Sequence, residues 1–142
     1  MATSVQLVFA ARDPGGLARF WRTALDYEPE PPPAGFTSWQ EFAREKNLPL
    51  EAGRDIDSAV DPDRVGPRLL FERADDVSER GAVHIDVNAA QGHGSAAERK
   101  SRVDAKVALL ESAGAATVRI VDRAEEYFVE MTDPEGNRLC VQ

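Results

Sequence analysis

His84 is the side chain in this 142-residue sequence that is best suited to move a proton. It lies in an alternating segment, residues 82–88, where His84, Asp86 and Asn88 share one face and apolar residues share the other. An imidazole changes charge near neutral pH, so His84 can act as a general acid or base if it faces a cleft. The alternative is a polar residue satisfied by Asp86, Glu72 or water, and the sequence leaves both interpretations open.

Two glutamates and a cysteine lie in segments with the same alternation. Glu72 alternates with Leu70, and Glu130 alternates with Phe128, so each carboxylate shares a strand face with an apolar side chain. Such a carboxylate can serve as a base or bind a ligand, whereas the alternative is a solvated strand residue. A nucleophilic role for Cys140 requires a cation that lowers its pKa. We interpret Cys140 instead as a small buried residue of the last strand.

Aromatic side chains gather in the less regular segment of residues 35–57. Ser38 predicts the start of a short helix over residues 39–46, and residues 47–57 have the composition of a loop. Irregular segments often carry the residues that determine ligand specificity. We therefore expect Trp39 and Phe36 to form the wall or lid of a pocket, with core packing as the alternative.

Hydrophobic periodicity predicts the elements that position these residues. Residues 4–10 are expected to form a strand in which Gln6 and Val8 share one face, followed by a helix that extends to Leu25. Further strands are predicted over residues 27–30, 68–73, 82–88, 116–121, 127–131 and 139–141, and a second long helix over residues 98–113. Strand, helix and three more strands thus occur twice, in residues 4–73 and 82–142.

A turn with the sequence Asp-Pro-acidic also occurs twice. Residues 133–137, Asp-Pro-Glu-Gly-Asn, have the residue types of a hairpin turn. Residues 61–66 repeat the scheme with two residues added before the glycine. Backbone geometry explains the residue types of both turns, so neither needs a catalytic role.

The composition restricts the partners. Lys and Arg number 17 against 25 Asp and Glu, a net charge of −8, which argues against nucleic acid and anionic membranes. No apolar run approaches the ~20 residues that span a bilayer. A single cysteine forms no internal disulfide and no multi-cysteine zinc site, which fits a reducing cytoplasm. We expect one α+β domain of cytoplasmic location.

Three segments carry a resemblance to a known superfamily. They are Ala-Arg-Asp-Pro with Leu-Ala-Arg-Phe-Trp in residues 11–21, Val-His-Ile-Asp-Val in residues 83–87, and the last turn with its strand in residues 133–141. The sequence resembles the vicinal oxygen chelate superfamily, which includes glyoxalase I, bleomycin-resistance proteins, fosfomycin-resistance enzymes and extradiol dioxygenases. It looks most like the glyoxalase-like branch of actinobacterial genomes. The resemblance implies two βαβββ modules, about residues 4–73 and 82–142, that form one domain with one concave cleft.

The resemblance also implies where metal ligands would lie. The four ligand positions of the superfamily fall on Gln6, Leu70, His84 and Cys140, with Glu72 two residues beyond Leu70 as a substitute. Only His84 keeps a usual ligand type, and glutamine is a poor ligand for a divalent transition metal. We therefore expect no metal cofactor, although a divalent metal remains an open alternative.

The resemblance implies that the cleft binds a small molecule whose identity the sequence does not give. The side chains expected to contact this ligand are Gln6, Val8, Trp39, Leu70, Phe128, Glu130 and Cys140, with His84 and Glu72 as the catalytic candidates. One hypothesis is a homodimeric sequestering protein of the bleomycin-resistance kind, with neutral or cationic ligands favoured by the acidic chain. The alternative is a metal-assisted lyase or isomerase of the glyoxalase kind, in which His84 or Glu72 abstracts a proton next to a carbonyl.

Overall fold

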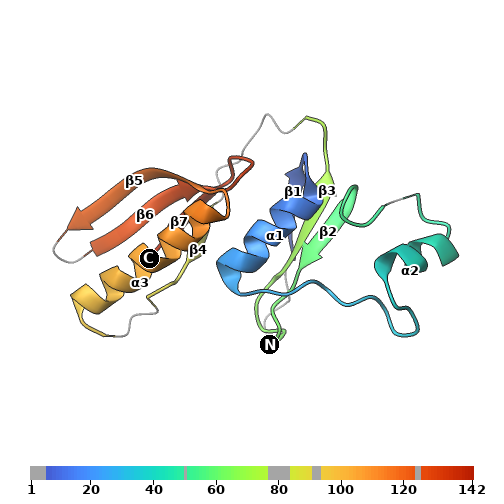
Figure 1. The fold of residues 1–142 in the computed structure, drawn as a ribbon, viewed down its shortest axis with the longest axis horizontal. Coiled ribbons are helices and arrows are strands. Elements are labelled where there is room, and N and C mark those ends of the chain that lie inside the picture. Colours follow the sequence, from blue (N-terminus) through green and yellow to red (C-terminus); the bar gives the residue numbers. More distant parts are fainter. Residues whose placement is uncertain (1–5, 50, 77–83, 91–93, 124–125) are drawn as a thin grey trace. The chain divides into compact units, whose positions relative to one another are not determined.

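The computed structural model describes residues 6–49, 51–76, 84–90, 94–123 and 126–142. The chain divides into two compact units, unit 1 of residues 1–78 and unit 2 of residues 79–142, and each combines one small sheet with helices (Figure 1). The expected α+β class is thereby confirmed. Within the described residues, no helix has the length and the apolar run that crossing a bilayer demands.

Unit 1 contains a three-stranded sheet. Its elements are β1 (Gln6–Ala11), α1 (Pro14–Leu25), α2 (Trp39–Glu45), β2 (Ile56–Ala59) and β3 (Arg68–Arg73). The strand order is β1-β3-β2, with β1 and β3 parallel and β2 antiparallel to β3. Helix α1 lies against one face of this sheet, while α2 lies to the side of β2 (Figure 1).

Helix α1 begins and packs as its sequence indicates. The Asp13 side chain accepts a hydrogen bond from the Gly16 amide at 3.0 Å, and Pro14 occupies the first turn, where no amide donor is needed. Trp21 is fully buried and its ring centroid lies 5.5 Å from that of Phe9, which stacks on Phe71 at 5.1 Å. These contacts fix which face of the sheet is covered by α1, and they leave the alternate residues of β1 and β3 on the opposite face.

Two predictions in unit 1 are wrong. Residues 27–30 were expected to form a strand, but only Glu28 pairs, in a single bridge to Val60. Proline at positions 29 and 31–33 removes the amide donors that a longer ladder needs. Residues 56–57 were expected in a loop but begin β2. The charged side chain of Asp57 is unusual in a strand, which is why the sequence pattern did not predict one here. Its charge is balanced by Arg22 of α1, whose Nη2 lies 2.6 Å from Asp57 Oδ1.

Unit 2 has the predicted strand–helix–three-strand order. Its elements are β4 (Ile85–Val87), α3 (Ala96–Ser112), β5 (Ala116–Arg123), β6 (Glu126–Thr132) and β7 (Arg138–Val141). The sheet order is β4-β7-β6-β5, in which only β4 and β7 are parallel. The strand predicted from residue 82 is seen from residue 85, since residues 82–83 lie outside the described part. Helix α3 begins two residues earlier than expected because Ser95 and Glu98 form a capping box.

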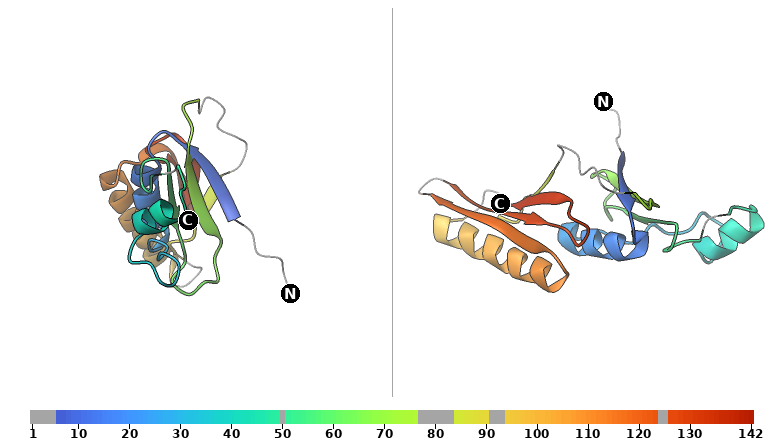
Figure 2. Two further views of the ribbon diagram at one scale, coloured as in Figure 1. Left: turned by 90° about the vertical axis from the view of Figure 1, so that its right-hand side faces the viewer. Right: turned by 90° about the horizontal axis from the view of Figure 1, so that it is seen from above.

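Helix α3 covers one face of this sheet, as Figure 2 shows in its view from above. Buried apolar side chains of the helix and strands meet there, including Val103, Leu110, Val129, Leu139 and Val141. The alternate residues of the strands therefore lie on the face opposite α3. This face carries the polar side chains for which a role was predicted.

Candidate functional site

Four of the predicted site residues share one face of the sheet in unit 1. Val8 is opposite Leu70 in the pairing of β1 with β3, and Gln6 and Glu72 lie on the same face by alternation. Phe9 and Phe71 point the other way, towards α1. The predicted common face is thus present, but its residues differ in surroundings, since Leu70 is buried and Val8 is exposed.

A guanidinium group occupies this face beside Gln6. Arg68 is opposite Gln6, and its Nη1 donates a hydrogen bond of 2.6 Å to Gln6 Oε1. Arg68 Nε donates to Glu30 Oε2 at 2.9 Å, and the two side chains form an ion pair. Ser58 Oγ donates to the same carboxylate oxygen at 3.3 Å. Arg68 and Glu30 could not be predicted from the sequence, because no local pattern connects residues 38 positions apart.

A pocket of about 140 Å³ lies next to this network, and we call it the α2 pocket. Its apolar lining includes Trp39, Phe42, Leu48, Ile56 and Leu70. Polar groups of Glu30, Ser58 and Arg68 also line it. Trp39 and Leu70, both predicted to contact a ligand, are therefore brought together. Val8 and Glu72 share the sheet face but not the lining of the pocket.

Glu72 lies further along the sheet than Leu70. It is opposite Ala10, four residues from the position opposite Gln6. At ~3.3 Å per residue this separation is about 13 Å along the strands. Leu70, between them, offers no ligand atom. A shared ion would require the side chains of Gln6 and Glu72 to extend towards each other, so their membership of one metal set stays a prediction. The catalytic pairing of Glu72 with His84 stays a prediction, because the two residues belong to different units.

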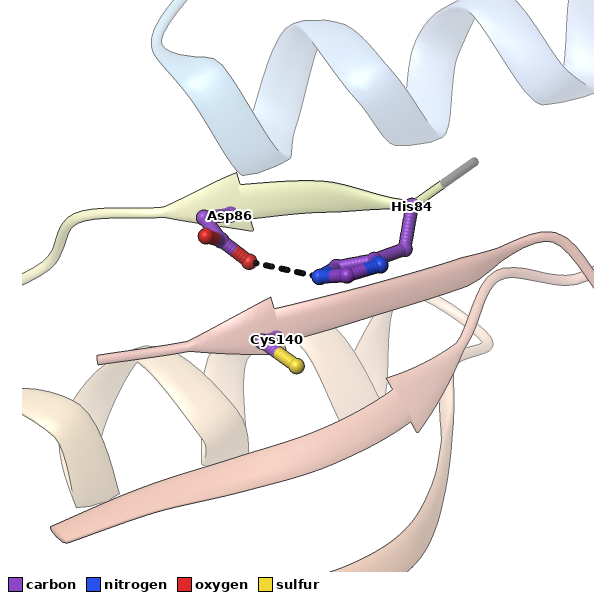
Figure 3. Close-up of side chains that lie close together, drawn as sticks. All are labelled: His84, Asp86 and Cys140. Carbon is purple, nitrogen blue, oxygen red and sulfur yellow. Dashed lines mark ion pairs between the residues drawn. The ribbon is translucent and has the colours of Figure 1, made fainter. Parts of the chain in front are cut away.

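Three potential ligands converge in unit 2. His84, Asp86 and Cys140 offer one ligand atom each, all within 4.8 Å of one another (Figure 3). Asp86 is opposite Cys140 on the neighbouring strand β7, and His84 Nε2 lies 3.2 Å from Asp86 Oδ1. The side chains of His84 and Asp86 are 49% and 47% exposed, so the contact is in water rather than in a dry site.

The environment of Cys140 opposes nucleophilic chemistry. Burial raises the pKa of its thiol, and the carboxylates of Asp86 and Glu130 raise it further. A protonated thiol is not a nucleophile. The interpretation of Cys140 as a buried residue is wrong: it is only half-buried, because Leu139 and Val141 are the residues of β7 that face α3.

Glu130 is held by an arginine that the sequence analysis did not single out. Glu130 is opposite Cys140 on one side and opposite Arg119 on the other. Arg119 Nη2 donates to Glu130 Oε1 at 2.7 Å, and this hydrogen bond is the main reason that the pKa of Glu130 is lowered. Phe128, half-buried, is two residues from Glu130 on β6 and so shares its face.

A second, wider hollow of about 1020 Å³ lies along α3 in unit 2. Its lining includes Phe128, but the charged groups there already pair with one another. Lys100 Nζ lies 2.6 Å from Asp122 Oδ2 and over the ring of Tyr127, and Arg123 contacts Glu126 at 3.4 Å. This hollow therefore offers a ligand fewer unsatisfied groups than its size suggests.

The metal positions of the superfamily are not reproduced by these residues. In unit 1, the oxygen of Gln6 accepts from a cation and Leu70 has no ligand atom. In unit 2, His84 is a usual ligand type, whereas the carboxylate expected at the last position is replaced by the thiol of Cys140. The three groups of unit 2 could contact an ion together, but the four-position set does not fit a divalent metal.

Comparison with known proteins agrees with this fold. The protein family described as "Glyoxalase-like domain" matches this chain over residues 6–142. Similar solved structures include a glyoxalase/bleomycin resistance protein/dioxygenase family enzyme from Burkholderia phytofirmans, at 13% identity and a TM-score of 0.60, covering 96% of this chain and 94% of that one. Another is the fosfomycin resistance protein FosX from Listeria monocytogenes, complexed with Mn(II) and sulfate. It has 10% identity and a TM-score of 0.62, and the match covers 100% of this chain and 90% of that one. FosX from Mesorhizobium loti has 11% identity and a TM-score of 0.61, and the match covers 100% of this chain and 91% of that one.

Among proteins of curated function, none matches this sequence significantly. At such low identities the solved structures show the fold alone. The family match, in contrast, extends over nearly the whole sequence, including both Asp-Pro turns and the strands that carry the candidate site. The chain therefore belongs to the glyoxalase-like domain family.

Proposed function

We propose that the protein binds a small molecule without a complete metal site, and that the α2 pocket is where the ligand binds. The observation that carries this proposal is the hydrogen bond from Arg68 to Gln6 beside an apolar pocket. A cation thus lies beside Gln6, the residue at which the superfamily resemblance implies a metal ligand. Apolar walls with a few polar groups are typical of small-molecule sites.

The metal part of the proposal is tested by elemental analysis of protein purified without chelator or affinity tag. Melting curves with added Ni, Zn, Mn and Fe(II) complete this test. We expect less than stoichiometric metal and no metal-dependent shift of the melting temperature. Stoichiometric metal that is lost in His84→Ala would overturn the proposal.

The ligand part is tested by thermal shift with a chemically diverse panel of small molecules. A ligand present at about 100 times its Kd adds about 2.7 kcal/mol to the free energy of unfolding, which is a shift of several degrees. We expect a subset of the panel to stabilise the protein with no product formed. If no compound of any class does so, small-molecule binding is refuted.

A second candidate function is proton transfer by His84, in a lyase or isomerase of the glyoxalase kind. It is favoured by the contact between His84 Nε2 and Asp86 Oδ1, since a carboxylate orients an imidazole base. FosX of Listeria monocytogenes was solved with Mn(II), so a metal-assisted variant is the form suggested by that relative. Turnover of a carbonyl substrate that His84→Ala abolishes, with the melting temperature unchanged, would bring this function forward.

Two further properties belong to the same proposal. We propose a homodimer, as implied by the superfamily resemblance, and a cytoplasmic location, supported by the single cysteine of the sequence. Light scattering after size exclusion should give twice the chain mass. A value equal to the chain mass at micromolar concentration would remove the dimer from the proposal.

A further inference from the structure

We infer that the α2 pocket accepts one neutral aromatic ring bearing a hydrogen-bond donor, an aryl hydroxyl or an aryl amine. This inference rests on the proposed function and names the class of ligand for the same site. Three features of unit 1 carry it: the size of the pocket, its aromatic wall, and a carboxylate oxygen with unused capacity.

The size of the pocket suits one ring. Its volume is about 140 Å³. An apolar cavity of about 150 Å³ lined by aliphatic and aromatic side chains is known to hold benzene. A six-membered ring with one small substituent therefore matches the pocket, and a larger ligand would extend beyond it into water.

The wall of the pocket is an aromatic cluster with a fixed geometry. The rings of Trp39 and Phe42 meet edge to face at 87° with centroids 5.6 Å apart, and Phe36 meets Phe42 at 88° and 5.1 Å. Trp39 Nε1 donates a hydrogen bond of 2.8 Å to the backbone oxygen of Glu30, which holds the indole in place. Offset and edge-to-face contacts of this kind are the ones that a further aromatic ring prefers.

Helix α2 also leaves apolar surface uncovered on this side. None of its residues is buried, although Trp39 and Phe42 belong to its inner face. Leu48, at the rim, is 44% exposed. A ring in the pocket would remove this surface from water, which is the main source of binding free energy for an apolar group.

The polar end of the pocket selects for a donor. Glu30 Oε2 accepts from Ser58 Oγ and from Arg68 Nε and Nη2, whereas Glu30 Oε1 accepts no hydrogen bond from the residues that the structure describes. Because the charge of Arg68 balances that of Glu30, a neutral ligand is preferred. A ligand O–H or N–H group can donate a hydrogen bond to Glu30 Oε1. An anionic ligand would instead be repelled by the negative charge of the same carboxylate.

The inference is tested by titrating the protein with phenol, toluene and benzoate while its indole N–H signals are followed by NMR. Trp39 reports the pocket, and the buried Trp21 serves as the internal reference; Trp39→Phe assigns the two signals. A hydrogen bond to a charged acceptor corresponds to about a tenfold gain in affinity. We expect phenol to shift the Trp39 signal with about tenfold lower Kd than toluene, and benzoate to bind more weakly than phenol.

Two matched variants locate the binding. Ala43 lines the pocket, whereas Gln40 is an exposed residue of the same helix outside the lining. Ala43→Leu should abolish the phenol-dependent shift by filling the pocket, and Gln40→Leu should leave it unchanged. Glu30→Gln should weaken phenol about tenfold and leave toluene unaffected. Melting curves of each variant confirm that it is folded before binding is compared.

The outcomes separate this inference from the proposed function. Equal binding of phenol and toluene, or stronger binding of benzoate, would overturn the inferred class. The same holds if none of the three probes binds while the diverse panel yields a ligand of another class, and in that case the proposed function stands. If neither the probes nor the panel stabilises the protein, both are refuted.

Discussion

Replacing Asp133 with alanine removes the acceptor around which the last hairpin folds. Asp133 Oδ1 accepts from the backbone amides of Glu135 and Asn137, both at 2.9 Å, and Oδ2 accepts from Asn137 Nδ2 at 2.7 Å. The residue is only 3% exposed. Alanine therefore leaves two backbone donors of a tight turn without their charged partner.

The cost follows from these bonds. A hydrogen bond to a charged group contributes about 1.5 kcal/mol at the low end of its range, so two backbone amides amount to about 3 kcal/mol. The side chain of Asn137 can turn to water, and we assign it no cost. Asp133→Asn keeps one acceptor oxygen but loses the charge, and we expect about half the loss, about 1.5 kcal/mol. Asp63→Ala, at an exposed carboxylate of the equivalent turn, should stay within about 0.5 kcal/mol of the parent protein.

Urea unfolding followed by circular dichroism and by tryptophan fluorescence measures these free energies. Trp21 and Trp39 both lie in unit 1, whereas Asp133 lies in unit 2. If residues 1–142 unfold as the single domain that we expect, both signals shift together to lower urea in Asp133→Ala. A loss below about 0.5 kcal/mol would refute the hydrogen-bond argument. A shift seen by dichroism alone would refute the single domain.

Three further outcomes are expected. Ser95→Ala should lower the free energy of unfolding by about 1 kcal/mol in urea titrations, because it removes the capping box of α3. The hydrogen bond to Asp104 is the main cause that raises the pKa of Tyr127 from 10.0 to about 12, so this group adds stability below pH 10 that is lost as the pH rises through 12. Asp104→Asn should therefore move the phenolate absorbance midpoint downwards. Iodoacetamide should modify Cys140 slowly at pH 8, and faster in Asp86→Asn, because the carboxylate raises the thiol pKa.

The elements with strong local signals could be predicted from the sequence. The turn at residues 133–137 forms as expected, and so does the one at residues 61–66. In both turns, an aspartate carboxylate accepts hydrogen bonds from backbone amides. Asp133 accepts from Glu135 and Asn137, and Asp61 accepts from Asp63, Val65 and Gly66. These interactions span at most five residues, so the residue types alone specify them.

Elements stabilised from a distance could not be predicted in the same way. Strand β2 carries Asp57, whose charge is tolerated only because Arg22, 35 residues earlier, lies across it. In the opposite error, a strand stopped by the prolines at positions 31–33 is predicted over residues 27–30, although Pro29 within the segment already removes an amide donor that a ladder needs. A local pattern thus indicates which conformations a segment can adopt, whereas contacts with residues far along the chain determine which one forms.

The candidate site shows the same limit and also gives a reason for the incomplete metal set. Alternation placed Gln6, Leu70 and Glu72 on one face, but it could not show that Arg68 reaches both Gln6 and Glu30, 62 and 38 residues away. Glutamine suits position 6 because its amide oxygen accepts a hydrogen bond from the guanidinium of Arg68. A histidine at this position would have to accept that hydrogen bond with the same ring nitrogen that binds a metal. The missing histidine and the arginine opposite it are therefore one physical arrangement. That arrangement supports the proposal that the ligand binds here without a metal.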